Sequence, residues 1–294
     1  MVTDQENFKN VAIYSSLKDK KVISIANQVK EVLSSLGINC LFPDSSKISK
    51  IISNKTLTDK TVIKKSDLVI AIGGDGTLLS SARNFGTHGI PILGINLGNL
   101  GFLTDIAPSN ITSDLNMVMS GNYVQDKRIF LEARIEGDNK TYKALNEVVL
   151  HSGSIAQLIE YDLFIDEEFV YRQKADGLII STSTGSTAYS LSGNGPIVSP
   201  EVKALTLLPM FPHSLNARTL ITGQEKEIKL TIANKTKAFL SMDSHLNLKV
   251  SSGENVFIKK AESELTLIHP TDHSFFASCR NKLGWSSGVP SKKS

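Results

Sequence analysis

The feature of this sequence that most restricts its fold is an apolar run that ends in a glycine-rich loop. Residues 68–72 read Leu-Val-Ile-Ala-Ile, and residues 73–77 follow as Gly-Gly-Asp-Gly-Thr. Consecutive apolar residues between turn residues are typical of a strand buried on both faces of a parallel sheet. Glycines lack a Cβ, so main-chain N–H groups of such a loop can face a phosphate where a helix begins. The segment therefore favours a phosphate-binding loop in an α/β sheet.

Asp75 is the one charged residue of this loop. A carboxylate beside phosphates is electrostatically unfavourable unless it binds a metal ion or accepts a proton from an attacking hydroxyl. Both uses indicate phosphoryl transfer. The segment alone equally allows a plain strand-to-helix turn with Asp75 as the N-cap. The chain has no G-x-x-x-x-G-K-[ST] and no G-x-G-x-x-G after a strand, which disfavours P-loop and Rossmann sites.

Composition restricts the class of protein further. The chain has 294 residues, enough for two domains, with 40% hydrophobic and 21% charged residues. Its net charge of +3 comes from dispersed charges without a basic block, so no nucleic-acid partner is predicted. No apolar stretch reaches the roughly 18 residues of a membrane span, and no export signal is evident. Cys40 and Cys279 lack C-x-x-C spacing, which favours reduced, buried thiols in a cytoplasmic protein.

Strands and helices alternate in the first part of the chain. The patterns predict strands at 11–14, 40–42, 68–72 and 90–95, and helices at 22–36 and 77–85. Such alternation indicates a parallel sheet covered by helices. Ligands of these sheets bind beyond the carboxyl ends of the strands, which is where residues 73–77 fall.

The second part of the chain is mostly strand. After a predicted helix at 111–119, short β-branched or aromatic runs occupy 129–135, 145–150, 158–165, 169–171, 228–232 and 246–250. We therefore predict an α/β N-terminal domain with a parallel sheet plus a β-rich, β-sandwich-like C-terminal domain. The expected limits are 1–115 for the first domain and 116–270 for the second. Residues 271–294, with a predicted helix at 275–285, are expected to return to the first domain.

Two further features have open alternatives. The loop at 94–103 carries three glycines and Phe102, and either forms a wall of a nucleotide site or crosses between domains with Phe102 in the core. Parallel strands would place it beside the first loop. His269 and His273 have the spacing of a helical metal pair, but Pro270 between them makes a helix there unfavourable. We therefore expect these histidines to be structural.

Polar residues interrupt the second, strand-rich part at two places. The segment 175–192 is rich in Ser, Thr and Gly, and suits a ribose, an amide or a base edge, although such clusters are often plain loops. Asn146 and Glu147 lie side by side in an apolar strand, so one of them should face the interior or a bulge. A buried carboxylate needs a partner. The alternative for this pair is an ordinary edge or bulge position.

Five motifs, taken in order, make the chain resemble the bacterial NAD kinase family. A GGDG loop alone is weak, because diacylglycerol kinases, sphingosine kinases and phosphofructokinases carry relatives of it, but five motifs in sequence are specific. The motifs are Gly73–Thr77, Gly98–Asp105, Asn146–Leu150, Asp176–Thr182 with Thr184–Ser192, and Pro209–Leu215.

The resemblance implies an activity and a fold. The activity is ATP-dependent phosphorylation of the adenosine ribose 2′-hydroxyl of NAD, which gives NADP and ADP and uses a divalent metal, Mg or Mn. The implied fold is an α/β domain followed by a β-rich domain, with the site in the crevice between them. The implied assembly is a homotetramer or homodimer. A lipid kinase and a non-catalytic dinucleotide sensor are the competing hypotheses.

The resemblance also assigns roles to residues. Asp75 matches the general base, Asn146 and Glu147 match residues that hold the adenosine ribose, and Thr187, Ala188 and Ser190 match an adenine-reading stretch. Lys174, Asp176 and Tyr189 match further NAD contacts, some of them reached across a subunit interface. The predicted ligand-binding residues are Gly73, Gly74, Asp75, Gly76, Thr77, Phe102, Asn146, Glu147, Lys174, Asp176, Thr184, Thr187, Ala188, Tyr189, Ser190, Leu191 and Ser192.

The chain departs from the family pattern at two positions. The late strand has Asp243-Ser244-His245, where the family commonly places Gln or a similar residue after the aspartate. Gln157 stands where relatives often have a basic residue. Neither change touches the predicted chemistry, but both could alter affinity or the discrimination between NAD and NADH.

Overall fold

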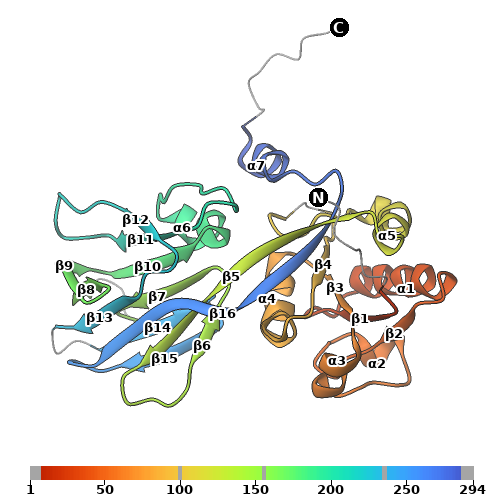
Figure 1. Ribbon diagram of the computed structural model, residues 1–294, viewed down its shortest axis with the longest axis horizontal. Helices are drawn as coiled ribbons and strands as arrows, with labels where there is room; N and C mark the ends of the chain where they lie inside the picture. Colours follow the sequence, from red (N-terminus) through yellow and green to blue (C-terminus); the bar gives the residue numbers. More distant parts are fainter. Residues whose placement is uncertain (1–7, 99–100, 154–156, 234–236, 286–294) are drawn as a thin grey trace, which may run out of the picture. The chain divides into compact units, whose positions relative to one another are not determined.

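The computed structural model describes residues 8–98, 101–153, 157–233 and 237–285. The chain divides into two compact units, each of which is described by itself (Figure 1). Unit 1 comprises Met1–Lys127 and Leu265–Ser294, and unit 2 comprises Arg128–Glu264. Two long strands, β5 (Tyr123–Ile135) and β16 (Asn255–Pro270), contribute residues to both units.

Unit 1 is built on a parallel sheet. Its strands are β1 (Asn10–Tyr14), β2 (Asn39–Leu41), β3 (Leu68–Ile72) and β4 (Ile92–Ile95), in the order β2-β1-β3-β4. The final residues of β16 extend this sheet, because Leu267 and Ile268 pair in parallel with Ile92 and Leu93 of β4. All five residues of β3 are buried, as a central strand of a covered parallel sheet requires.

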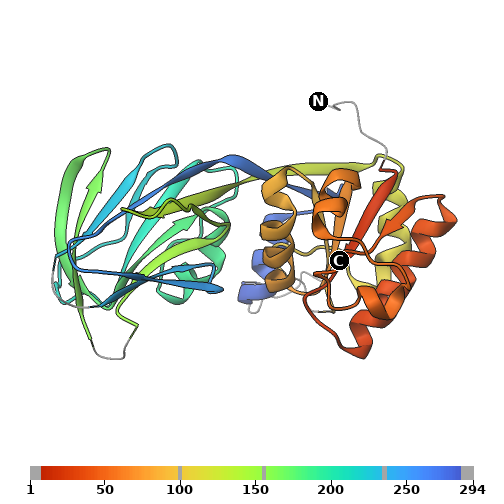
Figure 2. The same cartoon turned by 90° about the horizontal axis from the view of Figure 1, so that it is seen from below.

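Helices cover both faces of this sheet (Figure 2). Leu68, Ile70 and Ile72 of β3 belong to one core with apolar residues of α1 and α5. Tyr14 points to the opposite face, where its hydroxyl bonds Ser80 of α4 and its ring packs on Phe85. The helices are α1 (Lys20–Ser35), α2 (Ser49–Ile52), α3 (Asp59–Lys65), α4 (Asp75–Asn84), η1 (Gly86–His88), η2 (Pro108–Asn110), α5 (Ile111–Met119) and α7 (Phe275–Leu283).

Unit 2 is a two-layered β structure. One layer is an antiparallel sheet in the order β12-β11-β10-β7-β14-β15, and the other contains β16-β13-β8-β9 with β5 and β6. The additional strands are β6 (Tyr142–Ala144), β7 (Glu147–His151), β8 (Ile159–Ile165), β9 (Glu168–Ala175), β10 (Gly177–Thr182), β11 (Ala204–Met210), β12 (Leu220–Gly223), β13 (Ile228–Ile232), β14 (Ala238–Met242) and β15 (Leu246–Val250). The short helices η3 (Thr184–Thr187) and α6 (Tyr189–Ser192) follow β10.

Alternating residues of the two layers form one core. Val148 and Leu150 of β7 are buried together with Ile159, Tyr161 and Leu163 of β8, which belongs to the other layer. This period of two is the pattern of a sheet that buries one face. The predicted fold class, an α/β domain with a parallel sheet plus a β-rich domain, is confirmed.

Unit 1 consists of two separate stretches of the chain, and unit 2 lies between them in the sequence. Unit 2 begins at Arg128, inside β5, and unit 1 resumes at Leu265, inside β16. Within the described ranges, no helix is both long and apolar enough to cross a membrane.

Candidate functional site

The glycine-rich loop lies where β3 ends and α4 begins. Asp75 is the first residue of α4, and Gly74 is its N-cap, so Asp75 does not cap the helix. The Asp75 carboxylate instead accepts two main-chain hydrogen bonds from the loop after β4. The N–H of Phe102 donates to Oδ2 at 3.0 Å, and the N–H of Leu103 donates to Oδ1 at 3.1 Å. The two glycine-containing loops are therefore adjacent, as parallel pairing of β3 with β4 requires.

Close approach explains glycine at two of these positions. A Cβ on Gly101 would lie 2.1 Å from Oδ1 of Asp75, so the carboxylate or the loop would have to shift. Gly73 has φ +157°, and a Cβ there would lie 2.3 Å from Oγ1 of Thr77. The Thr77 hydroxyl is hydrogen-bonded to Ser16 at 2.8 Å. The loop is thus a tightly packed main-chain structure around one carboxylate.

Phe102 contributes its main chain to this arrangement. Its side chain is half-buried and does not belong to the apolar core of unit 1. Asn99 and Leu100, which belong to the same sequence motif, lie outside the described residues. Unit 1 therefore brings together six of the predicted site residues, namely Gly73, Gly74, Asp75, Gly76, Thr77 and Phe102.

In unit 2, Glu147 is the first residue of β7, and Asn146 directly precedes the strand. This strand pairs with β10 on one side and β14 on the other, so the pair is not at a sheet edge. Both residues are buried, with 7% and 3% of their surface exposed. The carboxylate of Asp243 holds this segment, because it accepts N–H groups of Leu145 and Asn146 at 2.8 Å each and of Glu147 at 3.2 Å.

The turn that carries Asp243 has an unusual backbone. Asp243 and Ser244 have φ of +45° and +55°, the left-handed region that non-glycine residues seldom adopt. The turn joins β14 to β15, and His245 at its end is exposed. Gln157 is exposed as well. The sequence suggested only that this turn departs from the family pattern, and it held no signal that Asp243 binds three consecutive N–H groups.

Three buried polar atoms of predicted site residues in unit 2 have no hydrogen-bond partner among the described residues. They are Oδ1 of Asn146, Oε2 of Glu147 and Oγ of Ser190. Burial, assisted by the nearby Asp243 carboxylate, raises the pKa of Glu147 to about 8, although the N–H of Tyr189 donates to it. Buried acceptors without partners are costly unless a ligand supplies donors.

The Ser/Thr/Gly segment packs directly on these residues. A Cβ on Gly185 would lie 2.1 Å from the carbonyl oxygen of Asn146, so glycine permits this contact. The Thr182 hydroxyl accepts the N–H of Gly185 at 3.1 Å. Thr184 is buried, and its Oγ1 accepts a hydrogen bond from Nη1 of Arg128 at 3.1 Å. The segment is therefore packed against Asn146 and held by hydrogen bonds to buried residues.

Cavities in unit 2 lie beside the same segment. Asp176 and Tyr189 line a cavity of about 430 Å³, and Tyr189 with Ser192 lines another of about 470 Å³. Met210 also lines both. Lys174, in β9, lines a different cavity of about 620 Å³, and its ammonium lies 3.9 Å from Glu160. Four of the predicted residues of unit 2 thus line three cavities, two of which share Tyr189.

Family models match both parts of the chain. Residues 1–123 match the ATP-NAD kinase N-terminal domain, and residues 145–270 match the ATP-NAD kinase C-terminal domain. This chain belongs to the NAD kinase family. Relatives that match over nearly their whole length support this assignment. The chain is 41% identical over 290 residues to an NAD kinase of Marinobacter nauticus, covering 97% of this chain and 99% of the relative. It is 43% identical over 274 residues to an NAD kinase of Teredinibacter turnerae, covering 91% of each.

Two solved structures share the fold of this chain. A yeast NADH kinase complexed with NADH superposes with a TM-score of 0.88 at 28% identity, over 98% of this chain and 91% of that one. An NAD kinase of Archaeoglobus fulgidus in complex with ATP superposes with a TM-score of 0.73 at 24% identity, over 95% and 99% of the two chains. The second likeness supports the fold alone.

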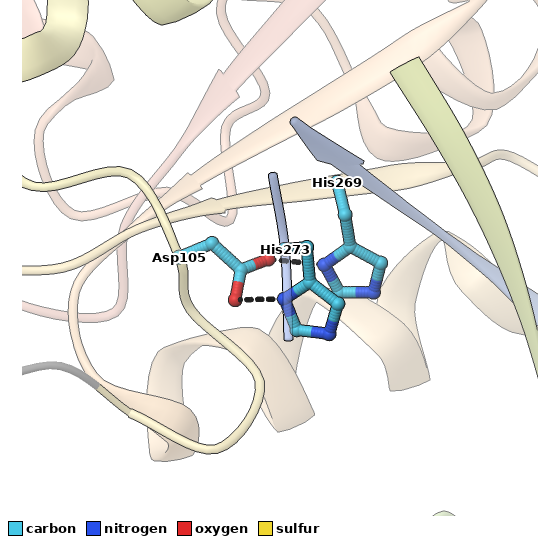
Figure 3. A group of neighbouring side chains, drawn as sticks. All are labelled: Asp105, His269 and His273. Carbon is cyan, nitrogen blue, oxygen red and sulfur yellow. Dashed lines mark hydrogen bonds and ion pairs between the residues drawn. The ribbon is translucent and has the colours of Figure 1, made fainter. Parts of the chain in front are cut away.

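One cluster of titratable residues in this NAD kinase family member was not predicted. Asp105, His269 and His273 meet in unit 1 (Figure 3). The spacing of the two histidines drew attention to them, but nothing in the sequence connected them to Asp105. His269 lies in strand β16, which continues to Pro270, and is not part of a helix.

Proposed function

We propose that this chain is an ATP-dependent NAD kinase in which Asp75 acts as the general base. It transfers the terminal phosphoryl group of ATP to the 2′-hydroxyl of the adenosine ribose of NAD, which gives NADP and ADP. Family membership supports the activity. The observation that carries the role of Asp75 is its carboxylate, held by two main-chain N–H groups at the first residue of α4.

The geometry of Asp75 suits proton abstraction. Each carboxylate oxygen accepts one N–H, so each retains a second acceptor site for a substrate hydroxyl. A ribose hydroxyl is a poor nucleophile, and an aligned base removes its proton as the new P–O bond forms. The first N–H groups of α4 and the helix dipole favour negative charge at the same place. No covalent enzyme intermediate is required.

The predicted divalent metal, Mg or Mn, fits this site as an ion carried mainly by ATP. In the described part of the chain, the one cluster of three close metal-binding side chains is Asp105, His269 and His273, which does not include Asp75. Mg²⁺ usually keeps several waters and binds substrate phosphates, so it does not require a dedicated cluster of protein ligands. When bound, such an ion neutralises charge on the phosphoryl group.

Unit 2 offers acceptors for the adenosine ribose. Oδ1 of Asn146 and Oε2 of Glu147 are buried without a partner among the residues that the structure describes. The hydroxyls of a ribose would supply the missing donors. Asp176 and Tyr189, which line a cavity of about 430 Å³, are proposed to contact the same dinucleotide. The remaining assignments, for Lys174 and for residues 184–192, stay predictions.

The predicted self-association also stays a prediction, as does a cytoplasmic location. The loop after β11 carries two strongly exposed apolar side chains, Phe211 at 80% and Leu215 at 94% exposure. Contiguous exposed apolar patches are typical of surfaces that associate, and we propose that these two side chains contribute to one. Light scattering on the purified chain would distinguish a monomer from the expected homodimer or homotetramer.

The activity is tested with purified protein, NAD, ATP and magnesium, using an NADP-specific dehydrogenase as readout. We expect NADP from the wild type and at least about 100-fold slower turnover from Asp75→Asn, with NAD binding retained in calorimetry. Asp138→Asn, in an exposed turn, is the matched control. Near-normal turnover of Asp75→Asn would rule out the base. NAD binding by a folded wild type without any NADP would favour the sensor hypothesis.

A further inference from the structure

In the cluster of Asp105, His269 and His273, the two imidazole rings donate hydrogen bonds to one carboxylate (Figure 3). Nδ1 of His273 donates to Oδ1 of Asp105 at 2.9 Å, and Nδ1 of His269 donates to Oδ2. The two rings are stacked, with centroids 3.9 Å apart and planes 14° from parallel. His269 is 1% exposed, and the side chains of Asp105 and His273 are 10% and 15% exposed.

This geometry fits hydrogen bonds better than a metal ion. The three ligand atoms lie within 4.8 Å of one another, and two imidazoles with one carboxylate suit zinc. An imidazole binds a metal in the plane of its ring, however, and the planes of two stacked rings do not converge on one ion. Two nearly parallel N–H groups instead match the two oxygens of a single carboxylate.

The cluster is also an ion pair. Burial alone would lower the pKa of His269, but the carboxylates of Asp105 and Asp126 raise it to about 8. Asp126 belongs to β5, and its Oδ2 lies 3.7 Å from Nε2 of His269. Burial alone would raise the pKa of Asp105, and the two histidines hold it at about 2. The charged and titratable groups facing His269 are therefore Asp105, Asp126 and His273.

The cluster fixes one end of the loop that contacts Asp75. Asp105 follows Thr104, which is fully buried, and the N–H groups of Asp105 and Ile106 both donate to the carbonyl oxygen of Gly94 at 3.3 Å. His269 lies on β16, next to Leu267 and Ile268, which pair with β4. The side chain of Asp105 thus connects the loop after β4 to the neighbouring strand.

The same loop supplies both N–H groups that hold the proposed base, Asp75. Only Thr104 separates Asp105 from Leu103, whose N–H donates to Asp75, and Phe102 donates the other hydrogen bond. The N–H of Gly101 donates to the carbonyl oxygen of Thr104 at 3.3 Å, so the segment from Gly101 to Asp105 is a short closed turn. Movement of Asp105 would therefore move the two donors.

We propose that Asp105, His269 and His273 are positioning residues for phosphoryl transfer. They hold residues 101–105 so that the N–H groups of Phe102 and Leu103 orient the Asp75 carboxylate. This inference rests on the proposed role of Asp75 as general base. Because the cluster acts through Asp75, it affects the chemical step more than the binding of either nucleotide.

The test compares two substitutions of His273, whose side chain is partly exposed. His273→Phe keeps a stacked ring and removes the Nδ1 donor, whereas His273→Asn keeps an amide N–H near the position of Nδ1. We expect His273→Phe to lower kcat about tenfold, with KM for NAD and ATP changed less than about twofold. His273→Asn should retain kcat within about twofold. Asp105→Asn, checked for folding by circular dichroism, provides a second variant with the same expected loss.

A cycle with Asp75→Asn separates positioning from a merely structural role. His273→Phe should leave the residual turnover of Asp75→Asn unchanged, because the base through which it acts is already absent. Equal losses in both backgrounds would overturn the proposal. Full activity of His273→Phe and Asp105→Asn beside an inactive Asp75→Asn would overturn this inference alone. Full activity of Asp75→Asn would overturn the base and this inference together.

Titration of chelator-treated protein with Co²⁺ completes the test. Without stoichiometric uptake, the cluster is held by hydrogen bonds as proposed. Uptake of one equivalent that His273→Phe abolishes would instead identify a metal site and overturn the proposal. The visible absorption of bound Co²⁺ gives a readout that does not depend on kinase activity.

Discussion

Two carboxylates proposed to act in the site, Asp75 in unit 1 and Glu147 in unit 2, have opposite surroundings. Each oxygen of Asp75 accepts a main-chain N–H, from Phe102 or Leu103. Glu147 is buried with one oxygen lacking a partner in the described part of the chain, and its pKa is raised to about 8. Both oxygens of Asp75 therefore have hydrogen-bond donors within the protein, whereas Oε2 of Glu147 has none among the described residues.

The difference shows two ways to prepare a site. Asp75 is oriented by main chain that glycine brings into contact, so its position is built into the loop. Asn146 and Glu147 are oriented through Asp243, whose carboxylate accepts three consecutive N–H groups. Their side-chain oxygens remain unsatisfied, which costs stability in the free protein and favours a ligand with hydroxyl donors.

The largest expected effect comes from crowding Asp75. Gly101→Ala would place a Cβ 2.1 Å from its Oδ1 and 2.4 Å from Oγ1 of Thr104, so the carboxylate or the loop must move. We expect kcat to fall at least about 100-fold, since a displacement of about 1 Å costs that much in positioned catalysis. Steady-state kinetics measure it. Gly223→Ala, where a Cβ meets nothing within 4 Å, is the control. Unchanged kcat in Gly101→Ala would show that the position of Asp75 is not critical.

The next effect concerns the support of the unit 2 site. Asp243→Asn removes the charge that binds the N–H groups of Leu145, Asn146 and Glu147. We expect the free energy of unfolding to fall by about 2 kcal/mol, and NAD affinity to fall with it. Denaturant unfolding and calorimetry measure the two losses. Asp138→Asn, whose side chain accepts the N–H of Lys140 in an exposed turn, should change the free energy of unfolding by less than about 0.5 kcal/mol. A stable Asp243→Asn with weakened NAD binding would assign Asp243 a direct ligand contact.

Removal of the buried Glu147 carboxylate should stabilise the ligand-free protein. The folded pKa of Glu147, about 8, exceeds its ordinary value of 4.5, so its stability contribution is full below pH 4.5 and is lost as pH rises toward 8. The free energy of unfolding of Glu147→Gln at pH 8 should therefore exceed that of the wild type by about 1–2 kcal/mol, and the variant should bind NAD more weakly. Differential scanning calorimetry at pH 5 and pH 8 tests the sign. A variant that is less stable at pH 8 would contradict the raised pKa.

The smallest effect belongs to the ion pair of unit 1. The folded pKa of His269, about 8, lies above the ordinary 6.5, so its stabilisation is present below pH 6.5 and is lost as pH rises through 8. We expect a loss of about 1 kcal/mol over this interval. The measurement is made in the Glu147→Gln background, so that Glu147 does not contribute. His269→Asn should remove the slope, and a slope that persists would assign it to another group.

The sequence was sufficient for the fold where one local pattern decided the structure. The strand predicted at 68–72 is β3, with the same limits, because its apolar residues are buried on both faces. The helix predicted from 77 begins at Asp75, since Asp75 and Gly76 have weak helix propensity and conceal its start. The strand expected from 129 begins at Tyr123, because Asp126, Lys127 and Arg128 interrupt its apolar pattern.

Strand β16 was not predicted. Its 16 residues include Lys259, Lys260, Glu262 and Glu264, which break the apolar alternation although Ala261 and Leu265 are buried. Its partners lie far away in sequence, on β13 in unit 2 and β4 in unit 1. Tertiary pairing of this kind overrides local propensity and leaves no short-range signal.

The site was predictable to a similar extent. Alternation of strands and helices indicated that the loops at 73–77 and 94–103 would be neighbours, and the hydrogen bonds from Phe102 and Leu103 to Asp75 show this contact. The support given by Asp243 to Asn146 spans 97 residues of sequence. Such supports are set by how the chain folds back on itself, so no motif could reveal them.

The interleaving of the units has a consequence for synthesis on the ribosome. Strand β4 pairs with Leu267 and Ile268 of β16, and Asp105 meets His269 and His273, only after those residues have been made. Unit 2, by contrast, is one continuous segment, Arg128–Glu264. Domains usually complete in the order in which they leave the ribosome, from the N-terminus onward. Here the first unit to begin is the last to be completed, so the nascent chain carries an open sheet edge until β16 has emerged.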